Sequence, residues 1–263
     1  MIVERIWAAN PLRNYHYLIG CAESGEALVI DPLDAAACLR RASERGWTIT
    51  QIVNTHEHHD HTDGNAEVVR ATGARVLAHA GAAARIGGVD QGLQAGDVIR
   101  VGRSVELEAL DTPGHTLTHV CLLAHGDTQA LYSGDTLFNA GVGNCRNGGD
   151  PELLYSTCRT LLKRLPANTQ IYPGHDYLMN NLRFTQNVEP TNTAAGAWLA
   201  RCQDTAPEAM PVMTLADELA VNSFFRLGER GLREGLRQRV AELAADASER
   251  EVFLRLRELR NSW

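Results

Sequence analysis

The stretch from Thr55 to His61 holds four histidines and two carboxylates within seven residues. Such side chains are costly to bury together unless a cation collects their lone pairs, so a metal site is the simplest explanation. Imidazole and carboxylate ligands without a thiolate suit zinc, iron or manganese. A loop of exposed histidines is the plain alternative, but it leaves similar residues farther along the chain unexplained.

A β-branched run at residues 49–53 precedes this stretch, and a loop leading into a helix follows it. The cluster is therefore expected at the carboxyl end of a strand. Alternate side chains of an extended segment share a face, so His56 and His58 can bind one ion while Glu57 points elsewhere. Asp60 and His61 follow the turn and can reach a second ion.

Three further ligand-type residues also follow predicted strands. His115 comes after a Pro-Gly turn, Asp135 follows Ser133-Gly134, and His175 follows Pro173-Gly174. Together with the first cluster they give two predicted ion sites. One ion is held by His56, His58 and His115, the other by Asp60, His61 and His175, and Asp135 bridges both.

Two such ions, ~3.5–4 Å apart, can share a water, lower its pKa toward neutrality and polarise a carbonyl under attack. Asp60 is the predicted catalytic residue, because as a ligand it can also orient the resulting hydroxide. This arrangement requires no Ser-His-Asp or Cys-His nucleophile.

Composition limits the partners of such a site. The chain has 263 residues, enough for one large domain or a main domain with an appendage, and its 44% hydrophobic and 22% charged content is close to average. A net charge of −7 argues against broad binding to nucleic acid or to an anionic membrane. An anionic substrate therefore needs a local basic patch.

The six cysteines are scattered without a C-x-x-C pair, and the first residues lack a basic segment followed by an apolar one. No stretch approaches 18 uninterrupted apolar residues. These features predict reduced thiols and a soluble cytoplasmic protein without a membrane partner. We expect a monomer or a weak homodimer.

The elements that must position these residues form two groups. Apolar and β-branched runs predict strands at residues 3–7, 15–19, 27–30, 49–53, 76–78, 98–101, 105–110, 120–123, 130–133 and 170–172, and helices at 35–45, 65–71 and 151–165. Only helical patterns follow, at residues 178–188, 194–202, 215–220, 231–245 and 249–260. The sequence thus predicts an α/β domain over residues 1–177 and a helical domain over residues 178–263.

The run His56 to His61 fits H-x-H-x-D-H, and the chain resembles the metallo-β-lactamase superfamily, which carries that motif. His115, Asp135 and His175 match the later ligands of the superfamily in order. The resemblance implies an αββα sandwich with two divalent metal ions at one edge of the sheets. Zinc is the first candidate, and iron and manganese are alternatives.

Within the superfamily the chain is most similar to glyoxalase II, the hydroxyacylglutathione hydrolases. The matching stretches are Gly134-Asp135-Thr136-Leu137-Phe138, Gly174-His175-Asp176-Tyr177, Asn180-Asn181-Leu182 and the family pattern T-[LI]-x-x-E-x-x-x-N-x-F-x-R at residues 214–226. The likeness extends over nearly the whole chain. It implies hydrolysis of S-(2-hydroxyacyl)glutathione to glutathione and a 2-hydroxy acid, as in methylglyoxal degradation.

The resemblance also implies the substrate contacts. Arg257 and Arg260 match a family pair, R-x-x-K, that binds the glutathione carboxylates, and Tyr177 matches a family tyrosine that contacts glutathione. One loop departs from the family pattern G-x-G-[KR]-x-[FY], with Asn144 at the basic position and Arg146 at the aromatic one. Either Arg146 restores the charge from two residues on, or the pocket accepts a different thiol carrier.

The competing hypothesis is an iron oxidoreductase, a persulfide dioxygenase of the same superfamily, which uses one iron held by two histidines and an aspartate. The complete second-site ligands and the helical carboxyl terminus argue against it. Hydrolases of lactones, β-lactams or RNA are further alternatives, as is a non-enzymatic binding module. His59 is expected to be exposed or to support a ligand, and His119 to be a packed or hydrogen-bonded partner.

Overall fold

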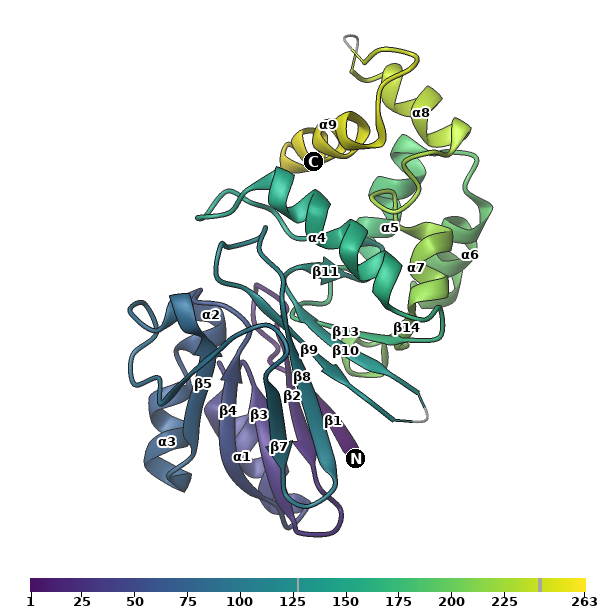
Figure 1. Cartoon of the computed structure of the whole chain (residues 1–263). Helices are drawn as coiled ribbons and strands as arrows, with labels where there is room; N and C mark the ends of the chain where they lie inside the picture. Colours follow the sequence, from purple (N-terminus) through teal and green to yellow (C-terminus); the bar gives the residue numbers. More distant parts are fainter. Residues whose placement is uncertain (127, 241–242) are drawn as a thin grey trace. The chain divides into compact units, whose positions relative to one another are not determined.

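The computed structural model describes residues 1–126, 128–240 and 243–263. These residues form two compact units. The first unit comprises Met1–Thr112 and Thr118–Gly134, and the second comprises Pro113–Leu117 and Asp135–Trp263. The predicted domain boundary between residues 177 and 178 falls inside the second unit and stays a prediction. Figure 1 labels the elements along the chain.

The first unit opens with a mixed sheet. Its strands, hydrogen-bonded in this order, are β1 (Ile2–Trp7), β2 (Tyr15–Gly20), β3 (Glu26–Ile30), β4 (Thr48–Asn54), β5 (Arg75–His79) and β6 (Gln91–Leu93). The first three run antiparallel, whereas β3 to β6 run parallel. Parallel neighbours end at the same edge of a sheet, and Ile30 of β3 pairs with Val53 of β4. The residues that follow these two strands therefore meet.

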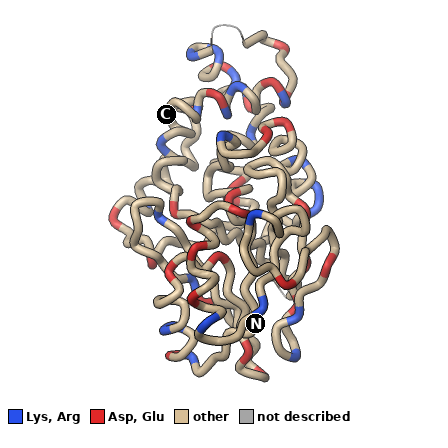
Figure 2. The backbone as a smooth tube through the Cα atoms, turned by 90° about the vertical axis from the view of Figure 1, so that its left-hand side faces the viewer, with Lys and Arg blue, Asp and Glu red and all other residues tan. Residues whose placement is uncertain are grey.

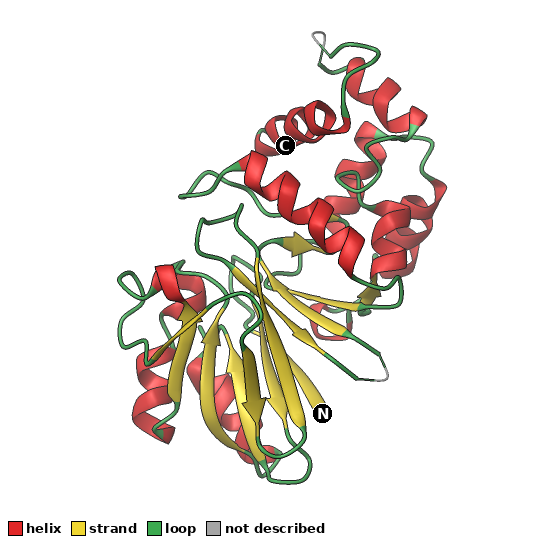
Figure 3. Ribbon diagram, in the orientation of Figure 1, coloured by secondary structure: helices red, strands yellow, loops and turns green. Residues whose placement is uncertain are grey.

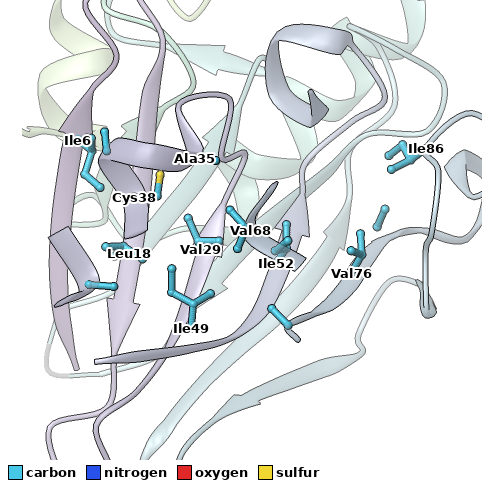
Figure 4. Close-up of a cluster of buried hydrophobic side chains, with 14 of the residues drawn as sticks. Ile6, Leu18, Val29, Ala35, Cys38, Ile49, Ile52, Val68, Val76 and Ile86 are labelled. Carbon is cyan, nitrogen blue, oxygen red and sulfur yellow. The ribbon is translucent and has the colours of Figure 1, made fainter. Parts of the chain in front are cut away.

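Helices cover one face of this sheet. α1 (Ala35–Glu44) connects β3 to β4, and α3 (Asn65–Thr72) connects β4 to β5. Apolar side chains of both helices pack with Val29, Ile52 and Val76 of the sheet in one buried cluster, shown in Figure 4. This burial provides the main hydrophobic stabilisation of the first layer pair.

The other face of the sheet meets an antiparallel meander. Its strands are β7 (Val98–Val101), β8 (Val105–Asp111), β9 (Val120–Ala124) and β10 (Ala130–Gly134), paired in sequence. The ring of Tyr17 on β2 packs edge-on against Tyr132 on β10, with 5.4 Å between centroids. Two sheets thus pack face to face, and the first unit shows three of the four predicted layers.

The second unit is mainly helical, as Figure 3 shows. Its helices are α4 (Pro151–Arg164), α5 (Leu178–Val188), α6 (Thr193–Cys202), α7 (Leu215–Val221), α8 (Arg230–Arg237) and α9 (Glu249–Asn261). Short strands form two pairs, β11 (Leu137–Phe138) with β12 (Gly141–Val142), and β13 (Gln170–Pro173) with β14 (Met213–Thr214). Leu182, Ala195 and Val221 join α5, α6 and α7 in a buried cluster.

One predicted helix is shorter than expected. The helix predicted over residues 231–245 ends at Arg237. Arg239 donates to the Gly235 carbonyl and to the Asn187 side chain, each at 2.8 Å, which satisfies a carbonyl of the last turn. Residues 241 and 242 of that prediction lie outside the described residues. The sequence also gave no sign of the shortest strands, β6, β11, β12 and β14.

Among the described residues, no helix is long and apolar enough to cross a bilayer. Figure 2 shows acidic and basic residues interspersed along the visible backbone. A basic site for an anionic ligand must therefore be local.

Candidate active site

The first ligand set, His56, His58, Asp60 and His61, lies where β4 ends. The chain turns after Asn54, and a single helical turn, α2 (His59–Thr62), carries Asp60 and His61. His56 Nε2 lies 3.0 Å from His58 Nδ1, and His61 Nε2 lies 3.4 Å from Asp60 Oδ2. The rings of His56 and His61 are 4.2 Å apart between centroids. The first unit thus brings these four predicted ligands together.

A buried carboxylate behind this set fixes the tautomers of two rings. Asp31, which follows β3, accepts hydrogen bonds from the Thr55 N–H at 2.8 Å, the Thr55 hydroxyl at 2.7 Å and His61 Nδ1 at 2.9 Å. Since the Thr55 hydroxyl gives its hydrogen to Asp31, its oxygen accepts from His56 Nδ1 at 3.0 Å. Both rings therefore keep the lone pair of Nε2 for a cation.

Close backbone packing holds the turn that carries His61. A Cβ atom at Gly64 would lie 1.7 Å from the Pro32 carbonyl oxygen, so only glycine fits there. Asn54 donates to the His61 carbonyl at 2.9 Å and accepts from Asn65 at 2.6 Å. These contacts tie the end of β4 to the start of α3.

Other side chains support the first set. Asn14 donates to the carbonyl oxygen and to Oδ2 of Asp60, each at 3.1 Å. Glu57 turns away from the set and pairs with Arg85, as the alternation along the strand predicted. His119 stacks on His56 with 5.1 Å between centroids, which is the packed role expected for it.

The second ligand set, His115, Asp135 and His175, belongs to the second unit, and all three side chains are buried. Asp135 Oδ2 lies 3.5 Å from His115 Nε2 and 3.3 Å from His175 Nε2. His115 Nδ1 donates to the carbonyl oxygen of Asn144 at 2.6 Å, which leaves the lone pair on Nε2. A Cβ atom at Gly143 would lie 1.9 Å from the Asp135 carbonyl oxygen, so the loop reaches this set only with glycine there.

The spacing of the donor atoms within each set fits small divalent cations. Two ligand atoms that share a tetrahedral zinc ion at about 2.0–2.1 Å lie about 3.3 Å from each other. Four of the ligand pairs within the sets, His56–His58, Asp60–His61, His115–Asp135 and Asp135–His175, are separated by 3.0, 3.4, 3.5 and 3.3 Å. Their imidazole and carboxylate donors, without a thiolate, are also those of zinc, iron and manganese sites.

A cavity of about 500 Å³ lies in the second unit. All five predicted substrate contacts line it: Asn144, Arg146, Tyr177, Arg257 and Arg260. Phe138, Val142, Asn147, Asn181, Asn261 and Trp263 complete the described lining, which includes no acidic side chain. We call this site the arginine cavity.

The two deeper arginines are held by neutral partners. Arg257 Nη1 donates to the carbonyls of Val142 and Gly143 at 3.0 and 2.9 Å, and Arg260 donates to Asn181 at 3.1 Å. Burial, followed by the charge of Arg260, lowers the pKa of Arg257 to about 10, and burial also lowers the pKa of Arg260. Both remain cationic near neutral pH, so an anionic ligand would offset their loss of hydration.

Arg146 lies at the rim of the arginine cavity. It is exposed and donates to the main-chain oxygen of Asn261, while its own N–H donates to the Asn144 side chain at 3.1 Å. Arg146 therefore adds a third cation to the cavity lining, two residues beyond the position where the family pattern has its basic residue.

Tyr177 connects the arginine cavity to the second ligand set. Its ring lines the cavity and stacks on His175, with 4.9 Å between centroids and 4° between planes. Phe138 packs edge-on against both rings. A ligand in the cavity is therefore adjacent to a metal-type histidine.

Asp31 and Asn14 are the supporting residues that sequence reasoning missed. Asp31 adopts a left-handed backbone conformation with φ 50°, which is unusual outside glycine and is often found at functional sites. The available signal was its place at the end of the strand that pairs in parallel with β4. Asn14 gave no comparable signal.

Known proteins resemble this chain over its full length. Residues 10–175 match the family model of the metallo-beta-lactamase superfamily, and residues 176–263 match that of the hydroxyacylglutathione hydrolase C-terminus. The chain is 56% identical to a hydroxyacylglutathione hydrolase of Polaromonas sp. and 52% identical to one of Nitrosococcus oceani, over 100% of each chain.

A solved structure supports the same fold. The crystal structure of ETHE1 from Myxococcus xanthus aligns with a TM-score of 0.68 at 25% identity and covers 93% of each chain. The predicted metallo-β-lactamase sandwich with a carboxyl-terminal helical region is therefore confirmed.

Proposed function

We propose, from the premise that this chain belongs to the hydroxyacylglutathione hydrolases of the metallo-β-lactamase superfamily, that its two ligand sets jointly hold two divalent metal ions. The chain is a thioester hydrolase that converts S-(2-hydroxyacyl)glutathione and water to glutathione and a 2-hydroxy acid. Superfamily membership and the His and Asp clusters indicate a dinuclear metal site. We propose zinc as the metal, and iron or manganese are the alternatives that metal analysis would reveal.

The stacking of Tyr177 on His175 is the main support for placing glutathione in the arginine cavity. Glutathione carries two carboxylates, and the cavity offers Arg146, Arg257 and Arg260 with no acidic residue in its described lining. Arginine binds carboxylates through parallel hydrogen bonds. A tripeptide held there presents its sulfur side toward the second ligand set.

Two bound ions would supply a water of lowered pKa and polarise the thioester carbonyl. Asp60, held at its main-chain and side-chain oxygens by Asn14, accepts a hydrogen bond from the attacking water and orients it. Asp31 keeps the Nε2 lone pairs of His56 and His61 directed toward the site. The arginines hold the thiol carrier so that the thioester carbon stays in place.

The comparisons favour thioester hydrolysis over the persulfide dioxygenase considered from the sequence. Identity of 52–56% extends over the whole chain, including the helical region that the dioxygenase hypothesis left unexplained. An oxygen electrode with glutathione persulfide as substrate provides the direct check, and we expect no uptake above the background rate.

The deciding experiment compares two thioesters on the purified, metal-analysed protein. S-D-lactoylglutathione carries the charged tripeptide, whereas S-lactoyl-N-acetylcysteamine has the same acyl group on an uncharged thiol. We expect two metal ions per chain and a strong preference in kcat/KM for the glutathione thioester. Arg257→Met should reduce that preference roughly 10–100-fold, because it removes a charge-assisted contact, and should leave hydrolysis of the uncharged thioester unchanged.

Leu254→Met on the same helix is the matched control, because its side chain is not among the residues that line the arginine cavity. Equal kcat/KM for the two thioesters in the unaltered protein would refute glutathione as the thiol carrier. A chain that binds two ions and hydrolyses neither thioester would refute the reaction.

A further inference from the structure

Glu218 is a fully buried carboxylate on α7 that touches neither ligand set in the described contacts and does not line the arginine cavity. Its two oxygens accept hydrogen bonds from the N–H of Ala140 at 3.1 and 2.9 Å. They also accept from the side chains of Asn139 at 3.2 Å and Asn222 at 2.9 Å. Burying a charge is unfavourable unless it is well hydrogen-bonded, so this concentration of donors points to a specific task.

The task concerns the two-residue loop between β11 and β12. Phe138 pairs with Gly141 across this hairpin, and Ala140 at its tip has φ 57°, a left-handed conformation that costs a non-glycine residue about 1–2 kcal/mol. Glu218 binds the N–H of that strained residue, and Asn222 donates to the Gly141 carbonyl at 3.2 Å. Glu218 on α7 and Asn222, the residue that follows this helix, therefore stabilise the strained conformation of the loop.

Two arginines of the proposed site depend on this loop. Its Asn139 carbonyl accepts from Asn181, the same side chain that receives the hydrogen bond of Arg260. The carbonyls of Val142 and Gly143, which follow directly, receive Arg257.

We propose that Glu218 is a positioning residue for substrate recognition: it fixes the Asn139–Ala140 loop, and through the loop it sets the places of Arg257 and Arg260. The inference rests on the proposed function, because it assumes that these arginines bind the carboxylates of glutathione. Glu218 thus lies outside the arginine cavity and influences the two arginines through the main chain of the loop.

The test is Glu218→Gln, which keeps the shape of the side chain but turns one oxygen into a donor. That donor would face the donor of Asn222 or of Ala140, so one partner is lost. The probe is S-methylglutathione, a thioether that cannot be hydrolysed, titrated by calorimetry at pH 8, above the raised pKa of about 7 of Glu218. We expect its affinity to fall roughly tenfold, as misplaced contact groups commonly cause, while kcat for S-lactoyl-N-acetylcysteamine changes less than twofold.

Glu189→Gln is the matched control. Glu189 is also buried and pairs with Arg226 through both oxygens, but among the described residues it contacts neither the loop nor the cavity lining. It should lower thermal stability and leave S-methylglutathione affinity within twofold. If both variants lose affinity equally, Glu218 has only a general structural role and the proposal is wrong.

A second variant keeps the proposal falsifiable if Glu218→Gln folds poorly. Ala140→Gly removes the left-handed strain, so the double variant Ala140→Gly/Glu218→Gln should fold better and recover part of the lost affinity. No recovery in a folded double variant would overturn the role of the loop. Failure of the unaltered protein to prefer the glutathione thioester would instead count against the proposed function alone.

Discussion

The two ligand sets reach similar geometries by opposite routes. The first set comes from six consecutive residues at the end of β4, and a carboxylate, Asp31, orients its rings. The second set comes from three loops far apart in sequence, and a main-chain oxygen orients His115. A mutation of Asp31 removes the side chain that orients the first set. A main-chain oxygen cannot be removed by mutation, so the orientation of His115 can be changed only through the residues that hold its loop.

The residues that surround the two ligand sets differ in the same way. The first set is surrounded by hydrogen-bonding side chains such as Asn14 and Thr55, which act on the ligands alone. The second set shares the loop of residues 141–144 with Arg257, and shares Tyr177 with the arginine cavity. Changes around the first set should therefore affect metal binding alone, whereas a change to the second set itself, such as loss of His175, should also affect substrate recognition.

Removal of one ligand from each set is the strongest test of their equivalence. We expect His56→Ala and His175→Ala each to lower kcat at least ~1,000-fold, because each removes part of the metal activation of water and carbonyl. Metal analysis should show about one ion lost per chain in both cases. Full metal content and near-normal turnover in His175→Ala would show that the second set is not a metal site.

The sequence predicted the first set more directly than the second. Residues 56–61 form a contiguous motif at the end of a β-branched run, so the local spacing alone suggested metal binding. His115, Asp135 and His175 are single residues after turns, and they were joined first by their shared position after predicted strands and then by their order within a family pattern. Strand and helix positions followed from apolar periodicity because most elements bury one face.

The supporting residues could not be predicted in the same way. Asp31 reaches Thr55 and His61 because β3 and β4 pair in parallel. Glu218 reaches Ala140 because α7 packs against a two-residue loop that the sequence did not reveal. Both are tertiary relations between segments more than 20 residues apart. The early end of α8 at Arg237 likewise coincides with a long-range contact, between Arg239 and Asn187.

Asp31→Asn should produce the next largest effect, confined to the first set. An amide can no longer accept at both oxygens, so His61 and His56 lose their fixed tautomers. We expect metal affinity to fall roughly 10–100-fold, as for other partners of ligand histidines, with S-methylglutathione affinity unchanged. Competition with a metal chelator measures the first quantity and calorimetry the second; a parallel loss of both would remove the distinction between the sets.

The pH dependence of stability should distinguish Glu218 from the surface carboxylates. Burial raises its pKa from 4.5 to about 7, against the opposing hydrogen bonds from Asn222, Ala140 and Asn139. The folded chain therefore binds this proton more tightly than the unfolded chain, and the associated stability is present below pH 4.5 and lost as pH rises through about 7.

Glu218→Gln lacks this titration, so its unfolding free energy should gain about 1–2 kcal/mol relative to the unaltered protein between pH 5.5 and pH 8. Urea unfolding of both proteins at the same metal loading measures the difference. Metal contributions common to both proteins cancel in the comparison. An identical difference at the two pH values would mean that Glu218 is ionised across the whole range.

Substitution of Trp263 should have the smallest effect, and only on substrate binding. Its indole lines the arginine cavity, donates to Asn180 at 3.2 Å and packs edge-on against Phe184, yet half of its surface is exposed. Trp263→Ala should raise KM for S-D-lactoylglutathione about threefold, the scale of one aromatic contact, with kcat and metal content unchanged. Trp263→Phe, which retains an aromatic wall, should restore most of the affinity, and equal KM values for the two variants would exclude the ring as a substrate contact.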